Sequence, residues 1–193
     1  MEEVLVVKTE KLNKYIQNRV GLITDCRREL LEVIINEHEF MPRPQAEADP
    51  GFRQIIPYVV LCRGEEIFTT RRLNKGGEAR LHGKISVGIG GHINPVDETD
   101  REKVLMRGLE RELTEEVSIR KAGALTPRGV IVDDTNSVGS VHLGLCFTMD
   151  VEGEVSVNET EKLTGAFMTL PELKAEWDNM ETWTQIALEG IFG

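Results

Sequence analysis

Apolar residues near the start of the chain occur first as a strand-like run and then at helical spacing. Residues 4–7 are branched apolar side chains in sequence, a pattern that favours a short strand. In residues 24–40 the apolar positions recur every three or four residues, which predicts a helix with Thr24 or Asp25 as its N-cap. The first part of the chain is therefore expected to hold a strand and a helix.

From residue 55 onward the pattern changes to β-rich runs separated by turn residues. Gly64 separates the first two runs in the manner of a hairpin. The predicted strands are residues 56–63, 65–71, 84–89, 127–133, 138–149 and 163–170. We therefore expect a main domain at residues 55–193, with residues 1–54 as an N-terminal extension packed on it.

Two amphipathic helices accompany these strands. Thr99 and Glu102 have the spacing of a capping box, which predicts a helix over residues 99–116. Its apolar stripe is Leu105, Leu109, Leu113 and Val117. The apolar stripe of the last helix is Trp183, Ile186, Ala187, Gly190 and Ile191, which we interpret as core. Helices between and after the strands predict an α+β fold with a mixed-sheet sandwich.

Composition narrows the class of protein. A chain of 193 residues can bury roughly 70% of its unfolded surface and needs no disulfide or structural metal. The formal net charge of -10 argues against a broad nucleic-acid surface. No apolar run approaches the 20 or so residues of a membrane span, no signal peptide is evident, and the three cysteines are far apart. We expect a soluble, cytoplasmic protein with reduced thiols, either a monomer or a homodimer.

Three glutamates share one edge of the predicted helix over residues 99–116. Glu112, Glu115 and Glu116 fall within an arc of about 100° beside the apolar stripe. Their like charges repel one another, and Arg111 can neutralise only part of that charge. A divalent cation with oxygen ligands, Mg²⁺ or Mn²⁺, would balance the rest. The alternative interpretation is an acidic helix face exposed to solvent.

Glycines precede this helix. Gly88, Gly90 and Gly91 follow a short apolar run, and a residue without a Cβ lets backbone amides and carbonyls approach a phosphate or a metal closely. The dinucleotide-binding pattern does not fit, because Ile93 stands where its last glycine would be and a loop follows. A P-loop does not fit either, because the terminal Gly-Lys-Ser/Thr is missing.

The segment from Gly91 to residue 119 resembles the box of the Nudix hydrolases. That box reads Gly, five residues, Glu, seven residues, Arg-Glu, apolar, any residue, Glu-Glu, any residue, Gly, apolar. Its Arg-Glu-apolar-any-Glu-Glu core is matched in full by Arg111-Glu112-Leu113-Thr114-Glu115-Glu116. The wider resemblance covers about residues 55–175, including an arginine at the end of a strand, Arg72.

The chain departs from the Nudix box in three ways. Six residues rather than five separate Gly91 from Glu98, and twelve rather than seven separate Glu98 from Arg111. Ser118 replaces the final glycine. The first box glutamate is therefore either Glu98 or Glu102, whereas the carboxylates of the core are all present.

The resemblance implies a fold, a reaction and a set of site residues. It implies a Nudix-like α/β/α sandwich with a mixed sheet, and hydrolysis, with Mg²⁺ or Mn²⁺, of a diphosphate linkage in a nucleoside diphosphate joined to another moiety. The implied metal ligands are Gly91, Glu112, Glu115 and Glu116. The implied catalytic residues are Arg111, Glu115 and Glu116. The implied substrate-binding residues are Gly90, Gly91, His92 and Arg72.

Some assignments stay open between alternatives. The general base is Glu159, Glu161 or a glutamate of the box. The alternative function is a non-catalytic Nudix-fold domain that senses a nucleotide or binds a protein. A prenyl diphosphate isomerase of the same fold would need a catalytic Cys-Glu pair, for which Cys62 and Cys146 are the candidates.

Overall fold

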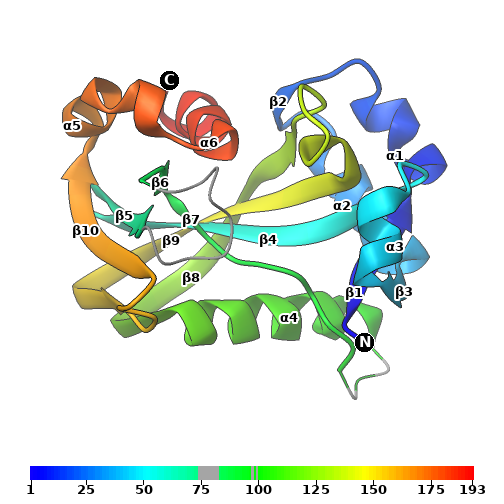
Figure 1. Ribbon diagram of the computed structural model, residues 1–193, viewed down its shortest axis with the longest axis horizontal. Helices are drawn as coiled ribbons and strands as arrows, with labels where there is room; N and C mark the ends of the chain where they lie inside the picture. Colours follow the sequence, from blue (N-terminus) through cyan, green and yellow to red (C-terminus); the bar gives the residue numbers. More distant parts are fainter. Residues whose placement is uncertain (74–82, 97, 99) are drawn as a thin grey trace.

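The protein is an α/β/α sandwich built on a mixed β-sheet (Figure 1). The computed structural model describes residues 1–73, 83–96, 98 and 100–193. The strands are β1 (Glu3–Lys8), β2 (Gly21–Ile23), β3 (Glu39–Pro42), β4 (Phe52–Arg63), β5 (Glu66–Arg72), β6 (Ile85–Ser86), β7 (Gly88–Ile89), β8 (Val117–Val132), β9 (His142–Val157) and β10 (Leu163–Thr169). The helices are α1 (Thr9–Ile16), α2 (Arg27–Glu37), α3 (Arg43–Ala48), α4 (Arg101–Glu116), α5 (Leu170–Ala175) and α6 (Thr182–Phe192), with 3₁₀ turns η2 (Gly139–Val141) and η3 (Trp177–Asn179).

The sheet combines antiparallel hairpins with one parallel pair. Its main path runs β10-β5-β4-β9-β8-β2, and β1, β3, β6 and β7 pair beside this path. Strands β4 and β9 are parallel, with Tyr58 opposite Cys146, while the other named pairs are antiparallel. The predicted α+β fold with a mixed sheet is therefore confirmed.

Strand β4 is buried on both sides because helices cover both faces of the sheet. Tyr58 and Val60 pack in one apolar cluster with residues of α5 and α6. Val59 and Leu61 pack in another with Leu109 of α4. Successive side chains of a strand point to opposite faces, so the continuous apolar run of β4 supplies both layers of core. Figure 1 shows α4 crossing one face and α5 and α6 covering the other.

Residues 1–54 contribute strands and core to the same sandwich. Strand β1 pairs with β4, placing Val6 opposite Gln54, and β2 pairs with the end of β8. One buried cluster contains Leu5 and Leu30 together with Val104 of α4 and residues of β8 and β9. The division of the chain at residue 54 stays a prediction about its folding units.

Most predicted strands overlap observed ones, but β4, β8 and β9 are longer than predicted. The predicted strand over residues 84–89 is divided into β6 and β7. The hairpin at Gly64 is confirmed, with β4 and β5 joined there and Arg63 opposite Glu66. Strand β8 begins well before its predicted start, β9 runs well beyond its predicted end, and Val117 pairs with Val157 at the far end of their ladder. The predicted start of β9 is wrong, since residues 139–141 form the 3₁₀ turn η2 and the strand begins at His142. Most of the added part of β8 is exposed, so it lacks the apolar signal from which a strand is predicted.

The predicted ends of two helices are wrong by a few residues. Helix α2 begins at Arg27 with Cys26 in the N-cap position, and its predicted caps, Thr24 and Asp25, lie outside it. The Asp25 carboxylate instead pairs with Arg19 at 2.7 Å. Helix α4 is capped by Asp100, whose side chain accepts from the backbone amides of residues 102 and 103. Thr99, the predicted cap, lies outside the described residues.

The buried face of α6 differs slightly from its predicted stripe. Thr184, Ala187 and Leu188 are buried, whereas Trp183 is only partly buried. The Trp183 ring packs edge-on against Tyr58 at a centroid separation of 5.8 Å. No helix among residues 1–73, 83–96, 98 and 100–193 is long and apolar enough to cross a membrane.

Candidate active site

A cavity of about 370 Å³ lies between the β4–β5 part of the sheet, the start of α6 and the end of α4. It collects side chains from segments far apart in the sequence. Its lining residues are Ile56, Tyr58, Thr70, Arg72, Ser86, Gly88, Gly90, Glu116, Glu159, Lys162, Leu163, Glu181 and Trp183. Of the residues predicted from the sequence, the cavity therefore brings together Arg72, Gly90, Glu116 and Glu159.

The glycines let the backbone run close against its neighbours beside the cavity. A Cβ on Gly88 would lie 2.1 Å from the Tyr58 ring, and one on Gly90 would lie 1.8 Å from the Pro57 carbonyl oxygen. A Cβ on Gly91 would lie 2.3 Å from Glu112 Oε2. Side chains at these positions would collide with the sheet or the glutamate, so the backbone of residues 88–91 lies directly against both.

Glu112 and Glu116 lie one helical turn apart on α4, and the pKa of each is raised. Burial is the main cause for Glu116, followed by the charge of Glu112, and together they raise its pKa to about 7 against the opposing effects of Arg72 and the Gly90 amide. Burial also raises the pKa of Glu112, although the neighbouring Arg111 acts to lower it. Only 12% of the Glu112 side chain is exposed. This face of α4 therefore carries more negative charge than its surroundings neutralise.

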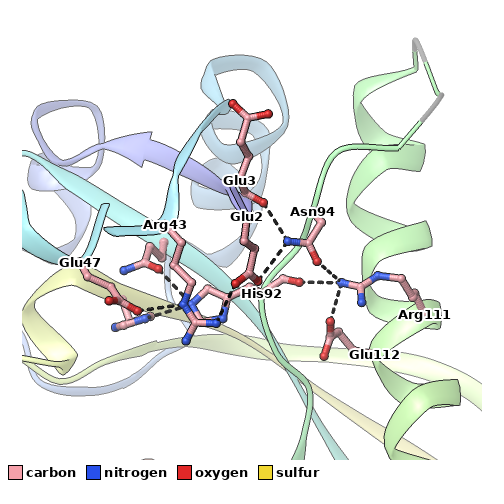
Figure 2. Close-up of polar contacts among 10 residues, drawn as sticks. Glu2, Glu3, Arg43, Glu47, His92, Asn94, Arg111 and Glu112 are labelled. Carbon is pink, nitrogen blue, oxygen red and sulfur yellow. Dashed lines mark hydrogen bonds and ion pairs between the residues drawn. The ribbon is translucent and has the colours of Figure 1, made fainter. Parts of the chain in front are cut away.

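Arg111 holds the other side of this glutamate cluster (Figure 2). Its Nη2 atom lies 2.5 Å from Glu112 Oε1. Its Nη1 donates to Glu115 Oε2 at 2.9 Å. Nη2 also donates to the His92 carbonyl and to Asn94 Oδ1, each at 2.8 Å. The predicted role of Arg111 as the ion-pair partner of the glutamates agrees with these contacts.

The three glutamates do not converge on one point. Glu115 pairs with Arg111 and leaves 59% of its side chain exposed, whereas Glu112 and Glu116 are turned inward. Residues four apart on a helix differ by about 40° in direction, but Glu115 and Glu116 differ by about 100°. Within the part of the chain that the structure describes, no three His, Cys, Asp or Glu side chains lie together as a ready metal cluster.

Glu98 and Glu102 occupy different environments. Glu98 Oε2 pairs with Arg107 of α4 at 3.1 Å, and only 13% of the Glu98 side chain is exposed. Glu98 Oε1 also accepts from the Asp100 amide. Glu102 lies exposed in the first turn of α4. Glu98 is thus the glutamate that the fold holds against the helix, and its place as the first box glutamate stays a prediction.

His92 follows the glycines but is not among the residues that line the cavity. Its Nε2 atom is 2.9 Å from Gln54 Oε1 and 3.4 Å from the Nε2 atom of His142. Burial, with Arg43 and His142 nearby, lowers the pKa of His92 to about 4, so the ring is neutral at pH 7. The structure therefore places His92 in a polar contact with β4 and β9 and not in the cavity wall.

The sequence analysis does not assign Lys162, Glu181 or Trp183 to a site, although all three line the cavity. Lys162 follows Glu159, and Glu181 and Trp183 flank the start of α6. Trp183 belongs to an amphipathic pattern and was therefore interpreted as core. No local signal marks the other two, because their proximity to Glu116 arises only when β10 and α6 pack on the sheet.

The cysteines do not provide the pair that an isomerase would need. Cys26, Cys62 and Cys146 are all free thiols, and none of them lines the cavity that contains Glu116. Burial raises the pKa of Cys146 to about 12, which keeps it protonated at neutral pH. The isomerase alternative therefore finds no nucleophile in this cavity.

Comparison with known proteins gives the family. No protein-family model matches the chain. The crystal structure of Tm1382, provisionally assigned to the Nudix hydrolases, superposes with a TM-score of 0.81 at 32% identity, over 97% of each chain. The chain belongs to the Nudix hydrolase family.

Two further proteins are similar to this Nudix protein, one in sequence and one in fold. Protein YmaB of Bacillus subtilis is 39% identical over 168 residues, which are 83% of this chain and 82% of YmaB. A bifunctional NMN adenylyltransferase/ADP ribose pyrophosphatase from Francisella tularensis, solved with AMP and a manganese ion, matches at 14% identity and a TM-score of 0.50. That match covers 71% of this chain and 40% of the bifunctional protein, so it shows the shared fold alone.

Proposed function

We propose that this Nudix protein is a pyrophosphohydrolase that cleaves the diphosphate linkage of a nucleoside diphosphate derivative with Mg²⁺ or Mn²⁺. One observation carries the proposal. Glu112 and Glu116 are partly buried one turn apart, and burial is the main cause that raises the pKa of each. The charge of Glu112 raises the pKa of Glu116 further, and Glu116 opens into a cavity. Two partly buried carboxylates with raised pKa values destabilise the folded protein. Such perturbed groups beside a cavity are typical of a functional site.

The donor set suits a hard divalent cation. Glu112 and Glu116 supply carboxylate oxygens, and the adjacent Gly91 supplies a backbone carbonyl. Glu115 completes the predicted set of ligands only if it leaves its pair with Arg111. A bound cation would neutralise the charge that develops on the phosphate oxygens.

Other cavity residues are suited to bind phosphate, to act as general base and to contact the rest of the substrate. Arg72 and Lys162 line the cavity, where they pair with Glu181 at 3.4 Å and with Glu159 at 2.7 Å. Their positive charges are suited to hold phosphate oxygens. Glu159 lines the cavity and Glu161 does not, so Glu159 is the better placed of the two loop candidates for the general base. Trp183 offers an aromatic face or edge to the non-phosphate part of the substrate.

A panel of nucleoside diphosphate derivatives tests the proposal. Purified protein is incubated with Mg²⁺, and the phosphate groups that hydrolysis exposes are released by a phosphatase and measured. We expect wild type to hydrolyse at least one compound. Glu116→Gln should be about a thousandfold slower, because the bound metal should lower the activation barrier by several kcal/mol. Glu110→Gln, the same change at an exposed position of α4, is the matched control. Equal rates for wild type and Glu116→Gln would refute the mechanism, and ligand binding without turnover would favour a sensing domain.

A further inference from the structure

The loop of residues 91–94 is held between the N-terminal strand β1 and the helix α4. The Leu5 amide of β1 donates to the Ile93 carbonyl at 2.8 Å. The Ile93 side chain is fully buried on the other side of the loop, where a Cβ on Gly108 of α4 would lie only 2.6 Å from it. The loop is therefore fixed to both neighbours by its backbone and by packing.

Asn94 joins the same two elements through its side-chain amide (Figure 2). Its Nδ2 donates to the Glu3 carbonyl of β1 at 2.8 Å and to Glu2 Oε1 at 3.3 Å. Its Oδ1 accepts from Arg111 Nη2 at 2.8 Å. An amide presents a donor and an acceptor at opposite ends of a rigid plane, so one side chain connects β1 to Arg111.

The β1 end of this connection is itself anchored. Arg43 of α3 donates to Glu2 Oε2 at 3.1 Å and to Glu47 Oε1 at 2.8 Å. The Arg43 amide also donates to the Glu2 carbonyl at 2.9 Å. Glu2 is thereby fixed by two hydrogen bonds to α3 before it meets Asn94.

At the α4 end, the position of Arg111 determines which oxygen of Glu112 stays available. Arg111 occupies Glu112 Oε1, and Oε2 lies against the Gly91 backbone. A guanidinium that also bonds to the His92 carbonyl and Asn94 Oδ1 cannot rotate freely around its long stem. The orientation of Glu112 is thus set by contacts that begin outside α4.

We propose that Asn94 is a positioning residue through which the N-terminal extension fixes Arg111 and, with it, the Glu112 carboxylate of the metal-binding helix. This inference rests on the proposed hydrolase function and extends it to residues 2–3, which lie far from the box in sequence. Residues that orient metal ligands by hydrogen bonds typically change metal affinity or activity by 10- to 100-fold when they are removed.

Asn94→Ala tests the proposal. It removes the hydrogen bonds of the Asn94 amide to Glu2, to the Glu3 carbonyl and to Arg111 without changing the charge of the site. Mn²⁺ alone is titrated into the full chain by calorimetry, and kcat and KM are measured on a substrate found by the panel. We expect the Mn²⁺ affinity and kcat each to fall about tenfold or more, with KM changed less. Asn179→Ala is the control, since Asn179 donates to Glu176 at 2.9 Å on the surface and has no contact with α4.

A second measurement reports how mobile the Arg111 side chain is. Nuclear magnetic resonance of the arginine side chains should show the Arg111 guanidinium restricted in wild type and more mobile in Asn94→Ala, where only the His92 carbonyl and the two glutamates still bind it. Wild-type Mn²⁺ affinity together with an unchanged Arg111 signal in Asn94→Ala would overturn the inference. Absence of hydrolysis by wild type would instead count against the proposed function, so the two failures are distinguishable.

Asn94→Ser keeps the test decisive if the alanine variant does not fold. The serine hydroxyl is too short to reach the Glu3 carbonyl and Arg111 at once, so one of the two contacts is lost. We expect the serine variant to bind Mn²⁺ more weakly than wild type. A serine variant that folds, binds Mn²⁺ as wild type does and keeps Arg111 restricted would overturn the inference on its own.

Discussion

Replacing Glu116 by glutamine should stabilise the metal-free protein while it abolishes activity. In the folded chain Glu116 has a pKa of about 7, against 4.5 for an ordinary glutamate, because it is buried beside the charge of Glu112. The folded state therefore retains a proton on Glu116 between these two pH values that the unfolded chain has already released. Stability consequently falls as the pH rises from about 4.5 to 7, and above pH 7 the full penalty is present.

The size of this penalty follows from the same pKa. A tenfold change in a proton equilibrium corresponds to about 1.4 kcal/mol, so ionised Glu116 destabilises the fold by about 3 kcal/mol at pH 8. Glutamine removes the charge but still buries an amide, so we expect a net gain of about 2 kcal/mol. For a chain of this length that is a rise in Tm of roughly 4–8 °C.

Thermal unfolding in EDTA at pH 5 and pH 8 measures how much the ionised Glu116 carboxylate destabilises the protein. Wild type should lose stability between these two pH values, and Glu116→Gln should lose markedly less. Glu115→Gln is the matched control, because Glu115 is mostly exposed and its pair with Arg111 contributes at most about 1 kcal/mol. Excess Mg²⁺ should raise the Tm of wild type more than that of Glu116→Gln. If Glu116→Gln were no more stable than wild type at pH 8 in EDTA, the assignment of Glu116 as a buried, uncompensated carboxylate would be wrong.

Three further substitutions test how the fold supports the site, each by urea denaturation. Gly90→Ala should destabilise the protein by about 3 kcal/mol or more, because its Cβ would lie 1.8 Å from the Pro57 carbonyl oxygen. Asp134→Ala should destabilise it by about 3 kcal/mol, since Arg53, whose side chain is 7% exposed, loses its ion-pair partner at 2.7 Å. Ile93→Ala should destabilise it by about 2–5 kcal/mol, because the side chain is fully buried between β1 and α4.

The outcomes that would contradict these expectations are equally specific. Gly64→Ala is the reference for Gly90→Ala: Gly64 has a φ of +60° but open space around it, so only about 1 kcal/mol should be lost. A loss at Gly90 no larger than that at Gly64 would mean that the backbone of β4 can yield. An unchanged urea midpoint for Asp134→Ala would show that the Gly139 carbonyl, which accepts from Arg53 at 3.0 Å, is a sufficient partner.

The sequence predicts the elements well where a local pattern carries the signal. The α4 stripe is an example, because Leu105 and Leu109 recur at helical spacing and are buried as expected. The added part of β8 shows the opposite case, since the exposed run from Arg120 to Ala124 becomes a strand only by pairing with β9. Helix ends are likewise decided by competing contacts, as when Arg19 engages Asp25.

Some features of the candidate site also follow from the local sequence, and others arise only from tertiary packing. The Arg-Glu-Leu-Thr-Glu-Glu run by itself determined that several carboxylates lie on neighbouring turns of one helix, because their directions follow from the repeat of the helix alone. Only the tertiary structure decided that Glu116 faces the cavity, whose other walls come from β4, β5 and the start of α6. It alone brought Trp183 to the cavity and Asn94 to the N-terminal strand. These contacts join residues dozens of positions apart, and no periodicity within a segment specifies which distant segment will pack against it.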